Sequence, residues 1–388
     1  MSEFRLTTVE EFEAATARLL ETGAKVGADT WQARVKNQTP HCKFGEEGIC
    51  CRICTMGPCR ITKKAPRGIC GCDVHGIVGR NYLKFTAGGA SAHSDHGREI
   101  CHTLYETSAD GCYKVKDPEK LIRIAKEWDI ETEGKDIYDL AHEVALTGLN
   151  EYGKPFGTQK FLKRAPESQQ KLWEENELAP YAIDREVSRS LHMTHMGCSS
   201  KPEALVKQAI RCGLGDGWGG SMMGTEFSDI LFGTPKPIET EANLGVMVEE
   251  NVNIVVHGHD PSLSEMICEV ADSPEMIAYA KEMGAKGITI SGVCCTSNEV
   301  AMRRGIPMAG NFLQQENVVL TGACEAIVVD VQCIFPALGP LSKCFHTKFI
   351  TTSPIAQMPD SEFIRFDAHT ALEKATEIVK VAIENFKN

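Results

Sequence analysis

Hydrophobic and polar positions alternate with a helical period through much of the first part of the chain. After a predicted helix that begins at Thr8, apolar side chains recur three and four positions apart around Leu121, Ile137 and Ala204. This spacing places them on one face of a helix. Residues 36–80 lack the periodicity and are rich in glycine, proline and cysteine, so we predict a loop that no hydrophobic core organises.

The pattern changes near residue 237, where short β-branched runs alternate with helical segments. Continuous apolar strands separated by helices are typical of a parallel sheet covered on both faces. The predicted strands are 252–256, 286–291, 326–331 and 348–352, and the predicted helices are 263–284, 296–304 and 369–386. We therefore predict an α/β protein. A helical domain over 1–238 carries the loop 36–80, and a doubly wound parallel, Rossmann-like domain covers 239–388.

Composition narrows the functional classes. The 388 residues carry a net charge of −12, which argues against a nucleic-acid surface, because such a surface needs concentrated positive charge. The sequence has no apolar run long enough to span a membrane, and its charged N-terminus lacks the apolar segment of a secretory signal. We therefore expect a cytoplasmic protein without a membrane span.

The cysteines point to metal chemistry. Seven of the 17 fall within residues 42–72, and clustered cysteines in a reducing compartment more often bind metal than form disulfides. Cys51, Cys54 and Cys59 form a C-x2-C-x4-C run, and Cys70 follows. Four thiolates from such a loop suit a [4Fe–4S] cluster, which takes one thiolate per iron. Zinc is the alternative, although its ligands more often come in two separated pairs.

Two further cysteines, Cys42 and Cys50, lie beside this set. Two thiolates cannot complete a four-iron cluster, but a two-fold axis would add the same two from a second subunit. We therefore predict a second cluster shared across a homodimer. A structural role or a smaller bound species is the alternative.

Three predicted strands run into metal-binding side chains. The strand 252–256 leads to His259, the strand 286–291 to Cys294 and Cys295, and the strand 326–331 to Cys333. Ligands of open α/β sheets bind beyond the carboxyl ends of the strands. One such residue is usually a packing residue, but three in one sheet favour a shared metal site, and histidine with thiolates suits iron or nickel.

Histidines also recur along one predicted helix. His93, His96 and His102 are spaced so that they line one side of it. Imidazole exchanges protons near neutral pH, so we predict a proton path. A solvated polar face is the alternative.

Together these motifs resemble the nickel–iron carbon monoxide dehydrogenases, specifically their anaerobic catalytic subunit. The similarity runs along nearly the whole chain, and its motifs follow the order of the family. They are the cysteine run from Cys42 to Cys59, 67-RGICG-71, 230-ILFGTP-235, 257-HGHDP-261, 292-GVCCTSNEV-300 and 332-QCI-334.

The resemblance implies a role for each candidate. The electron-relay [4Fe–4S] cluster, one per subunit, matches Cys51, Cys54, Cys59 and Cys70, and the cluster that bridges the homodimer matches Cys42 and Cys50. The active-site cluster matches His259, Cys295 and Cys333, with Cys294 as a further candidate, and the proton path matches His93, His96 and His102. The implied reaction takes CO and water to CO2, two protons and two electrons, with a ferredoxin-like protein as electron carrier.

The sequence also departs from the family. Members are commonly longer, with a second α/β domain that supplies three more cysteines, one of them for nickel, and a catalytic lysine. Here only Cys344 follows Cys333, so we expect a short form, with a third iron–sulfur cluster but without a complete nickel site. Glu99 stands where the family usually places a histidine of the proton path. A non-catalytic electron-transfer or small-molecule-sensing dimer is therefore the alternative function.

Overall fold

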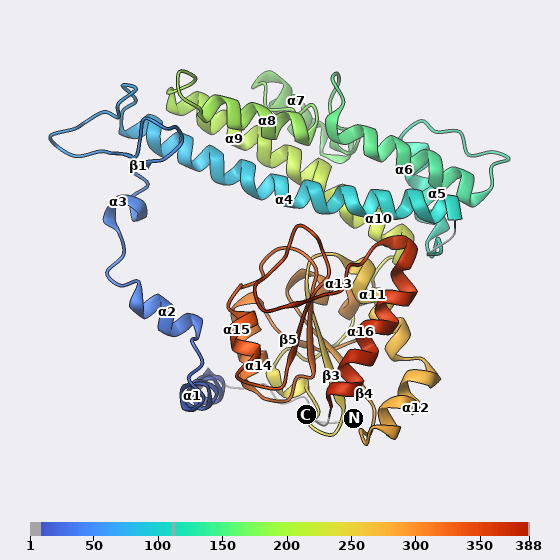
Figure 1. The fold of residues 1–388 in the computed structure, drawn as a ribbon. Helices are drawn as coiled ribbons and strands as arrows, with labels where there is room; N and C mark the ends of the chain where they lie inside the picture. Colours follow the sequence, from blue (N-terminus) through green and yellow to red (C-terminus); the bar gives the residue numbers. More distant parts are fainter. Residues whose placement is uncertain (1–8, 111–112, 387–388) are drawn as a thin grey trace. The chain divides into compact units, whose positions relative to one another are not determined.

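The computed structural model describes residues 9–110 and 113–386, and the chain divides into two compact units (Figure 1). Residues 40–233 form a helical unit. The described residues up to Thr39, together with Thr234 onward, form an α/β unit that contains a parallel sheet. The predicted fold class, helical followed by doubly wound α/β, is confirmed.

The helical unit is built along one long helix, α4 (Val74–Asp110). Its buried face includes Leu83, Ile100 and Leu104, which are fully shielded from solvent. The other helices of this unit are α5 (Pro118–Glu127), α6 (Ile137–Gly153), α7 (Glu167–Glu175), α8 (Ile183–Thr194), α9 (Pro202–Gly215) and α10 (Met222–Phe232). Of these, α6, α8, α9 and α10 pack directly on α4.

A cysteine-rich loop precedes α4. It contains the short helix α3 (Lys43–Glu46) and an antiparallel pair of two-residue strands, β1 (Cys50–Cys51) and β2 (Cys59–Arg60). Within residues 40–73 only Cys72 is buried. The loop therefore has almost no hydrophobic core of its own, as its composition predicts.

The α/β unit contains a six-stranded parallel sheet in the order β5-β4-β3-β6-β7-β8. Its strands are β3 (Val252–Gly258), β4 (Ile288–Val293), β5 (Met308–Gly310), β6 (Ala326–Val329), β7 (Lys348–Thr351) and β8 (Glu362–Phe363). The chain moves outward from β3 to β5 and then returns to place β6 on the other side of β3. The strand order thus reverses between β3 and β6, which is where α/β sheets bind ligands.

Helices cover both faces of this sheet (Figure 1). One group consists of α11 (Pro261–Ala271), α12 (Pro274–Glu282), α13 (Cys294–Arg304) and α16 (Ala371–Asn385), and the other of α14 (Gln315–Leu320) and α15 (Leu338–Ser342). The predicted helix 263–284 is two helices, because Ser273 caps the second and Pro274 opens it. The short edge strands β5 and β8 lie outside the predicted set.

The first helix belongs to the α/β unit, which differs from the predicted boundary of 1–238. Helix α1 (Val9–Lys25) packs on α14, with Leu19 and Leu20 against the core of the α/β unit. The following helix α2 (Trp31–Asn37) is tied to the same unit, since Arg34 pairs with the buried carboxylate of Glu316. Thr8, the predicted first residue of this helix, lies outside the described residues.

Candidate metal centres

Four of the predicted ligands meet at one cavity of the helical unit. Cys51, Cys54, Cys59 and Cys70 all line it, and it encloses about 380 Å³ including its mouth. Gly57 makes the turn between the second and third of these cysteines. A Cβ at Gly57 would lie 3.2 Å from the carbonyl oxygen of Cys51 and 3.2 Å from the amide nitrogen of Cys59, so the turn leaves little room for a side chain.

Hydrogen-bond donors approach two of the sulfurs. The amide of Ile69 donates to Sγ of Cys59 at 3.4 Å, and Nη1 of Arg80 donates to Sγ of Cys70 at 3.8 Å. The backbone N–H of Cys72, with further help from Arg80, lowers the pKa of the Cys70 thiol against the opposing effect of burial. Four thiols around one cavity, with a buried cation beside them, fit an anionic iron–sulfur cluster.

Cys42 and Cys50 lie outside this cavity lining. Cys42 is exposed, and Cys50 is half-buried in β1. The side chain of Asn81 on α4 donates to the carbonyl oxygens of Gly48 and Cys50, both at 2.9 Å, and so anchors the loop to the helix. The two thiols are therefore separate from the four that line the cavity.

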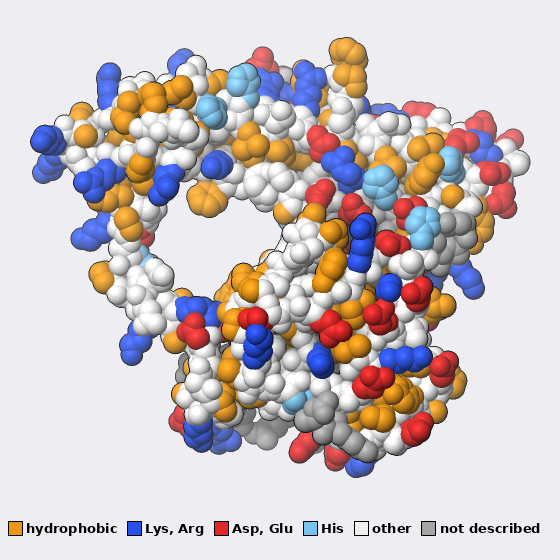
Figure 2. All heavy atoms as spheres, in the orientation of Figure 1, with side chains coloured by type: hydrophobic (Ala, Val, Ile, Leu, Met, Phe, Trp, Pro, Cys, Tyr) orange, Lys and Arg blue, Asp and Glu red, His pale blue; other side chains and the backbone are white. Residues whose placement is uncertain are grey.

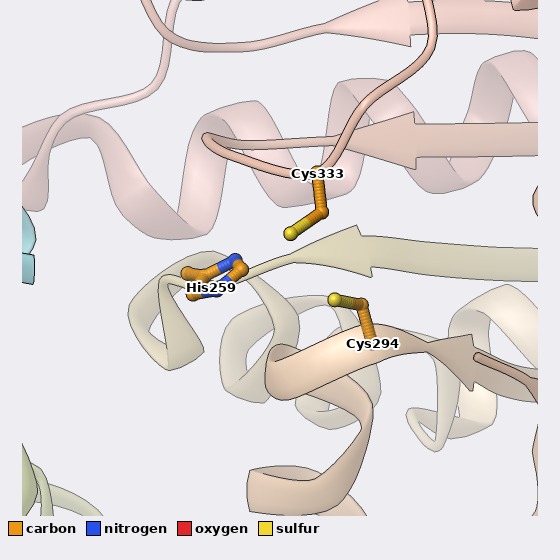
Figure 3. A group of neighbouring side chains, drawn as sticks. All are labelled: His259, Cys294 and Cys333. Carbon is orange, nitrogen blue, oxygen red and sulfur yellow. The ribbon is translucent and has the colours of Figure 1, made fainter. Parts of the chain in front are cut away.

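A second group forms at the carboxyl ends of three adjacent strands. His259 follows β3, Cys294 follows β4 and Cys333 follows β6, and their ligand atoms lie within 4.8 Å of one another. Figure 3 shows both sulfurs directed toward the imidazole. The structure thus brings together Cys294, which the sequence names only as a further candidate, whereas Cys295 lies next to it, exposed and outside the group. A hydrogen bond with Cys295, together with burial, raises the pKa of Cys294.

The backbone at this group adopts conformations that side chains rarely take. Cys294, Gln332 and Cys333 have φ angles of 70°, 67° and 59°, in the left-handed region. Such conformations cost about 1–3 kcal/mol each and cluster at functional sites. Gly258, just before His259, likewise has a positive φ of 136°. It also leaves no room for a side chain, because a Cβ there would lie 1.9 Å from Oδ1 of Asp330.

Asp330 is a residue of this site that the sequence analysis missed. Its buried carboxylate accepts hydrogen bonds from the backbone amides of His259, at 2.5 Å, and Val331. Burial raises the pKa of Asp330 well above its usual range. The side chain thus connects the end of β6 with the turn that carries the imidazole.

Gln315 is a second missed residue. Its Nε2 donates to the carbonyl oxygen of Cys333 at 2.9 Å, while its Oε1 accepts from the amide of Phe335 at 2.7 Å and lies 3.2 Å from Nε2 of His257. Burial lowers the pKa of His257 to about 4. Nε2 of Gln315 also donates to the carbonyl oxygen of Phe312 at 2.5 Å. Its other partners are more than fifteen residues away in the chain, so the local sequence does not mark Gln315 as part of the site.

The predicted histidine path lies on α4. His93 and His96 are half-buried, and Glu99 and His102 are exposed. Nδ1 of His93 lies 2.9 Å from Oδ2 of Asp216. Asp216, which the sequence analysis missed, opens a π-helical segment, Asp216–Ser221, of the kind found at functional sites.

Comparison with known proteins identifies the class. Residues 49–388 match the Prismane/CO dehydrogenase family, and the chain belongs to it. It is 47% identical over 392 residues to carbon monoxide dehydrogenase 1 of Methanosarcina acetivorans and 46% identical over 384 residues to that of Methanosarcina mazei. The matches cover 100% and 98% of this chain but 62% and 61% of the relatives, so the chain spans about three fifths of their length.

Solved structures give the same class. A nickel-free carbon monoxide dehydrogenase from Thermococcus sp. AM4 matches with a TM-score of 0.94 and 48% identity, covering 96% of this chain and 60% of that one. Carbon monoxide dehydrogenase IV from Carboxydothermus hydrogenoformans matches with a TM-score of 0.92 and 40% identity, covering 95% and 59%.

The surface and the helices add two observations. Figure 2 shows Lys and Arg side chains around the loop that carries β1, at one end of α4. Residues 48–72 contain five exposed cations and no acidic residue; the cations are Arg52, Arg60, Lys63, Lys64 and Arg67.

Within the described ranges, no helix combines the length and apolarity needed to cross a membrane.

Proposed function

We propose that the protein oxidises carbon monoxide with water to CO2, two protons and two electrons, or runs this reaction in reverse. One observation carries the proposal: His259, Cys294 and Cys333 converge at the switch point of the sheet in a chain of the carbon monoxide dehydrogenase family. A histidine with two thiolates is a donor set that iron or nickel accepts.

The strand-end residues have distinct tasks in this proposal. His259, Cys294 and Cys333 would hold iron of a third cluster, with Cys295 as an additional thiolate next to them. When bound, such a centre supplies an open coordination position for a small molecule and a route for electrons. The buried carboxylate of Asp330 and the amide of Gln315 fix the backbone around these ligands. Nickel at this centre is part of the proposal and is tested directly below.

Electrons leave through the loop. Cys51, Cys54, Cys59 and Cys70 would hold a [4Fe–4S] cluster that passes one electron at a time. Protons leave along α4, where His93 exchanges them and the carboxylate of Asp216 orients its ring.

We also propose a homodimer with a cluster shared through Cys42 and Cys50. A stripe of exposed apolar side chains on α4 supports it, because Val78, Tyr82 and Phe85 are spaced at helical intervals on one face. Phe85 is 82% exposed. Val78 packs near Gly48, which is six residues from Cys42 and two from Cys50 in the chain. A second copy packed on this stripe would bring its own two thiols to the same place.

The electron carrier is, in this proposal, a small acidic redox protein of the ferredoxin type. The exposed cations of residues 48–72 support it, because they belong to the same loop as the relay cysteines on a chain whose net charge is negative. We place the reaction in the cytoplasm, where reduced thiols persist.

The test uses protein purified without oxygen. We expect the wild-type protein to contain iron and, at the strand-end centre, nickel. We also expect it to reduce a viologen dye only when CO is present. The Cys333→Ser variant should lose most of this rate, while Cys344→Ser, a half-exposed thiol of the same unit outside the group, should keep it. Iron-loaded wild type that reduces no dye with CO would contradict the proposal and favour a purely electron-transferring dimer.

A further inference from the structure

A buried arginine lies against the relay cavity. Arg80, on the second turn of α4, is 3% exposed and is one of the residues that line the cavity. Its Nε donates to the carbonyl oxygen of Ser199 at 2.8 Å, which holds the guanidinium in place. Its Nη1 then reaches Sγ of Cys70 at 3.8 Å.

Among the described residues, no ion pair involves the charge of Arg80, whose guanidinium instead contacts Ser199 and Cys70. Oδ1 of Asp73, in the same loop, accepts from the amide of Gly76. Guanidinium stays protonated in proteins. A buried charge is costly unless an opposite charge accompanies it, so the cation requires a negative group at the cavity.

The proposed relay cluster is such a group. Four thiolates outweigh the positive charge of an iron–sulfur core, so the whole carries net negative charge, and each added electron makes it more negative. A fixed cation therefore stabilises the reduced form more than the oxidised form. Net charge and hydrogen bonds to the sulfurs are two of the factors that set the potential of such clusters.

We infer that Arg80 is a positioning residue that raises the reduction potential of the cluster held by Cys51, Cys54, Cys59 and Cys70. The inference rests on the proposed function of this cavity. It assigns Arg80 to neither substrate binding nor proton transfer. Its effect is to make the relay a better electron acceptor while the cluster stays covered on the side of α4.

The test compares two arginines near the same cavity. Arg80→Gln removes the buried charge, and Arg67→Gln removes an exposed charge of the same loop. Cluster reduction is followed by EPR during redox titration of protein purified without oxygen, and the signal absent from a Cys51→Ser variant identifies the cavity cluster. Iron and sulfide analysis checks that each variant is loaded.

We expect Arg80→Gln to lower the ratio of reduced to oxidised cluster at a fixed potential about tenfold, which is a shift of about −59 mV for one electron. Arg67→Gln should change the ratio less than about twofold, because solvent screens an exposed charge. A loaded Arg80→Gln variant with the wild-type potential would overturn the inference and leave the proposed function intact. Wild type without the cavity signal would overturn both.

If the Arg80→Gln variant binds no cluster, a variant that keeps the positive charge still tests the inference. Arg80→Lys keeps the cation but not the planar fork that reaches both Ser199 and Cys70. If charge sets the potential, its ratio should stay within about twofold of the wild type. A tenfold drop in Arg80→Lys would show that the charge is not what sets the potential and would overturn the inference.

Discussion

His93 and Asp216 meet through Nδ1 and Oδ2 at 2.9 Å, although 123 residues separate them in the chain. The approach depends on small residues where α4 crosses the π-helical segment. A Cβ at Gly97 would lie 2.4 Å from the carbonyl oxygen of Gly220, and a Cβ at Gly220 would lie 2.9 Å from Cα of Ser94. The glycines let the two backbones approach closely enough for the imidazole to reach the carboxylate.

The first prediction concerns this pair. Asp216→Asn should lower CO-dependent dye reduction about a hundredfold, because the ring loses the carboxylate that orients it for proton transfer. Iron content should stay unchanged. The control is Asp95→Asn, which changes an exposed acid on α4, the helix of His93, and should keep the wild-type rate. Equal rates in both variants would remove Asp216 from the proton path.

The second prediction concerns the apolar stripe on α4. Phe85→Ser should weaken dimerisation about a hundredfold, as expected when an exposed aromatic anchor of an interface is lost. Analytical ultracentrifugation of the anaerobic protein measures the dissociation constant. Phe156→Ser removes a phenylalanine of similar exposure, 85%, from outside the stripe and should leave the dimer intact. An unchanged dissociation constant in Phe85→Ser would place any interface elsewhere.

The third prediction concerns the cations of the loop. The double change Lys63→Glu and Lys64→Glu should slow electron transfer to an acidic ferredoxin about tenfold at low ionic strength, because steering charges are reversed. The difference from wild type should shrink at high salt. Reversing two exposed lysines away from the loop, Lys171 and Lys281, is the control. A loss that persists at high salt would argue against electrostatic docking.

The fourth prediction concerns stability of the helical unit. Lys120 and Asp229 form a buried ion pair, at most 5% exposed, and Glu226 lies 3.5 Å from the same ammonium. Lys120→Met should cost about 3–5 kcal/mol, because it removes the ammonium that neutralises the buried carboxylate of Asp229, while Glu226 keeps its pair with Arg164. Thermal unfolding measures the loss. Lys135→Met breaks a half-exposed pair with Glu143 and should cost less than about 1 kcal/mol.

Much of the fold could be predicted from the sequence because the burial pattern is local. The apolar runs that become β3, β4, β6 and β7 are continuous, since both faces of the sheet are covered, and a helix is the next element after each of the first three. The short strands β5 and β8 carry too few residues for a pattern. Helix α1 shows an apolar face in the sequence, but which unit that face packs against depends on partners near Val318 and Leu320, about three hundred residues away.

The candidate site divides in the same way. The candidate cysteines and histidines could be predicted because their spacing in the sequence, or their position directly after a strand, indicates a metal ligand. The position of Cys294 beside His259 and Cys333 could not be predicted, because it depends on the backbone at Cys294, whose φ of 70° is in the left-handed region. Asp216 had a weaker signal, the glycine-rich run 215-GDGWGGS-221 inside a helical stretch. Arg80 and Gln315 had none.

The shortage of buried residues in the loop has a consequence for the order of assembly. Residues 40–73 bury only Cys72, so little apolar packing holds the four thiols of the loop together, and we expect folding of the loop to be coupled to insertion of the proposed cluster. The strand-end group is different, because it lies at the end of a formed sheet, where Asp330 holds the backbone of His259 and Gln315 holds that of Cys333. If both proposed centres form, we expect two stages of maturation, in which one metal centre organises its own loop and the other enters a site that the sheet has already built.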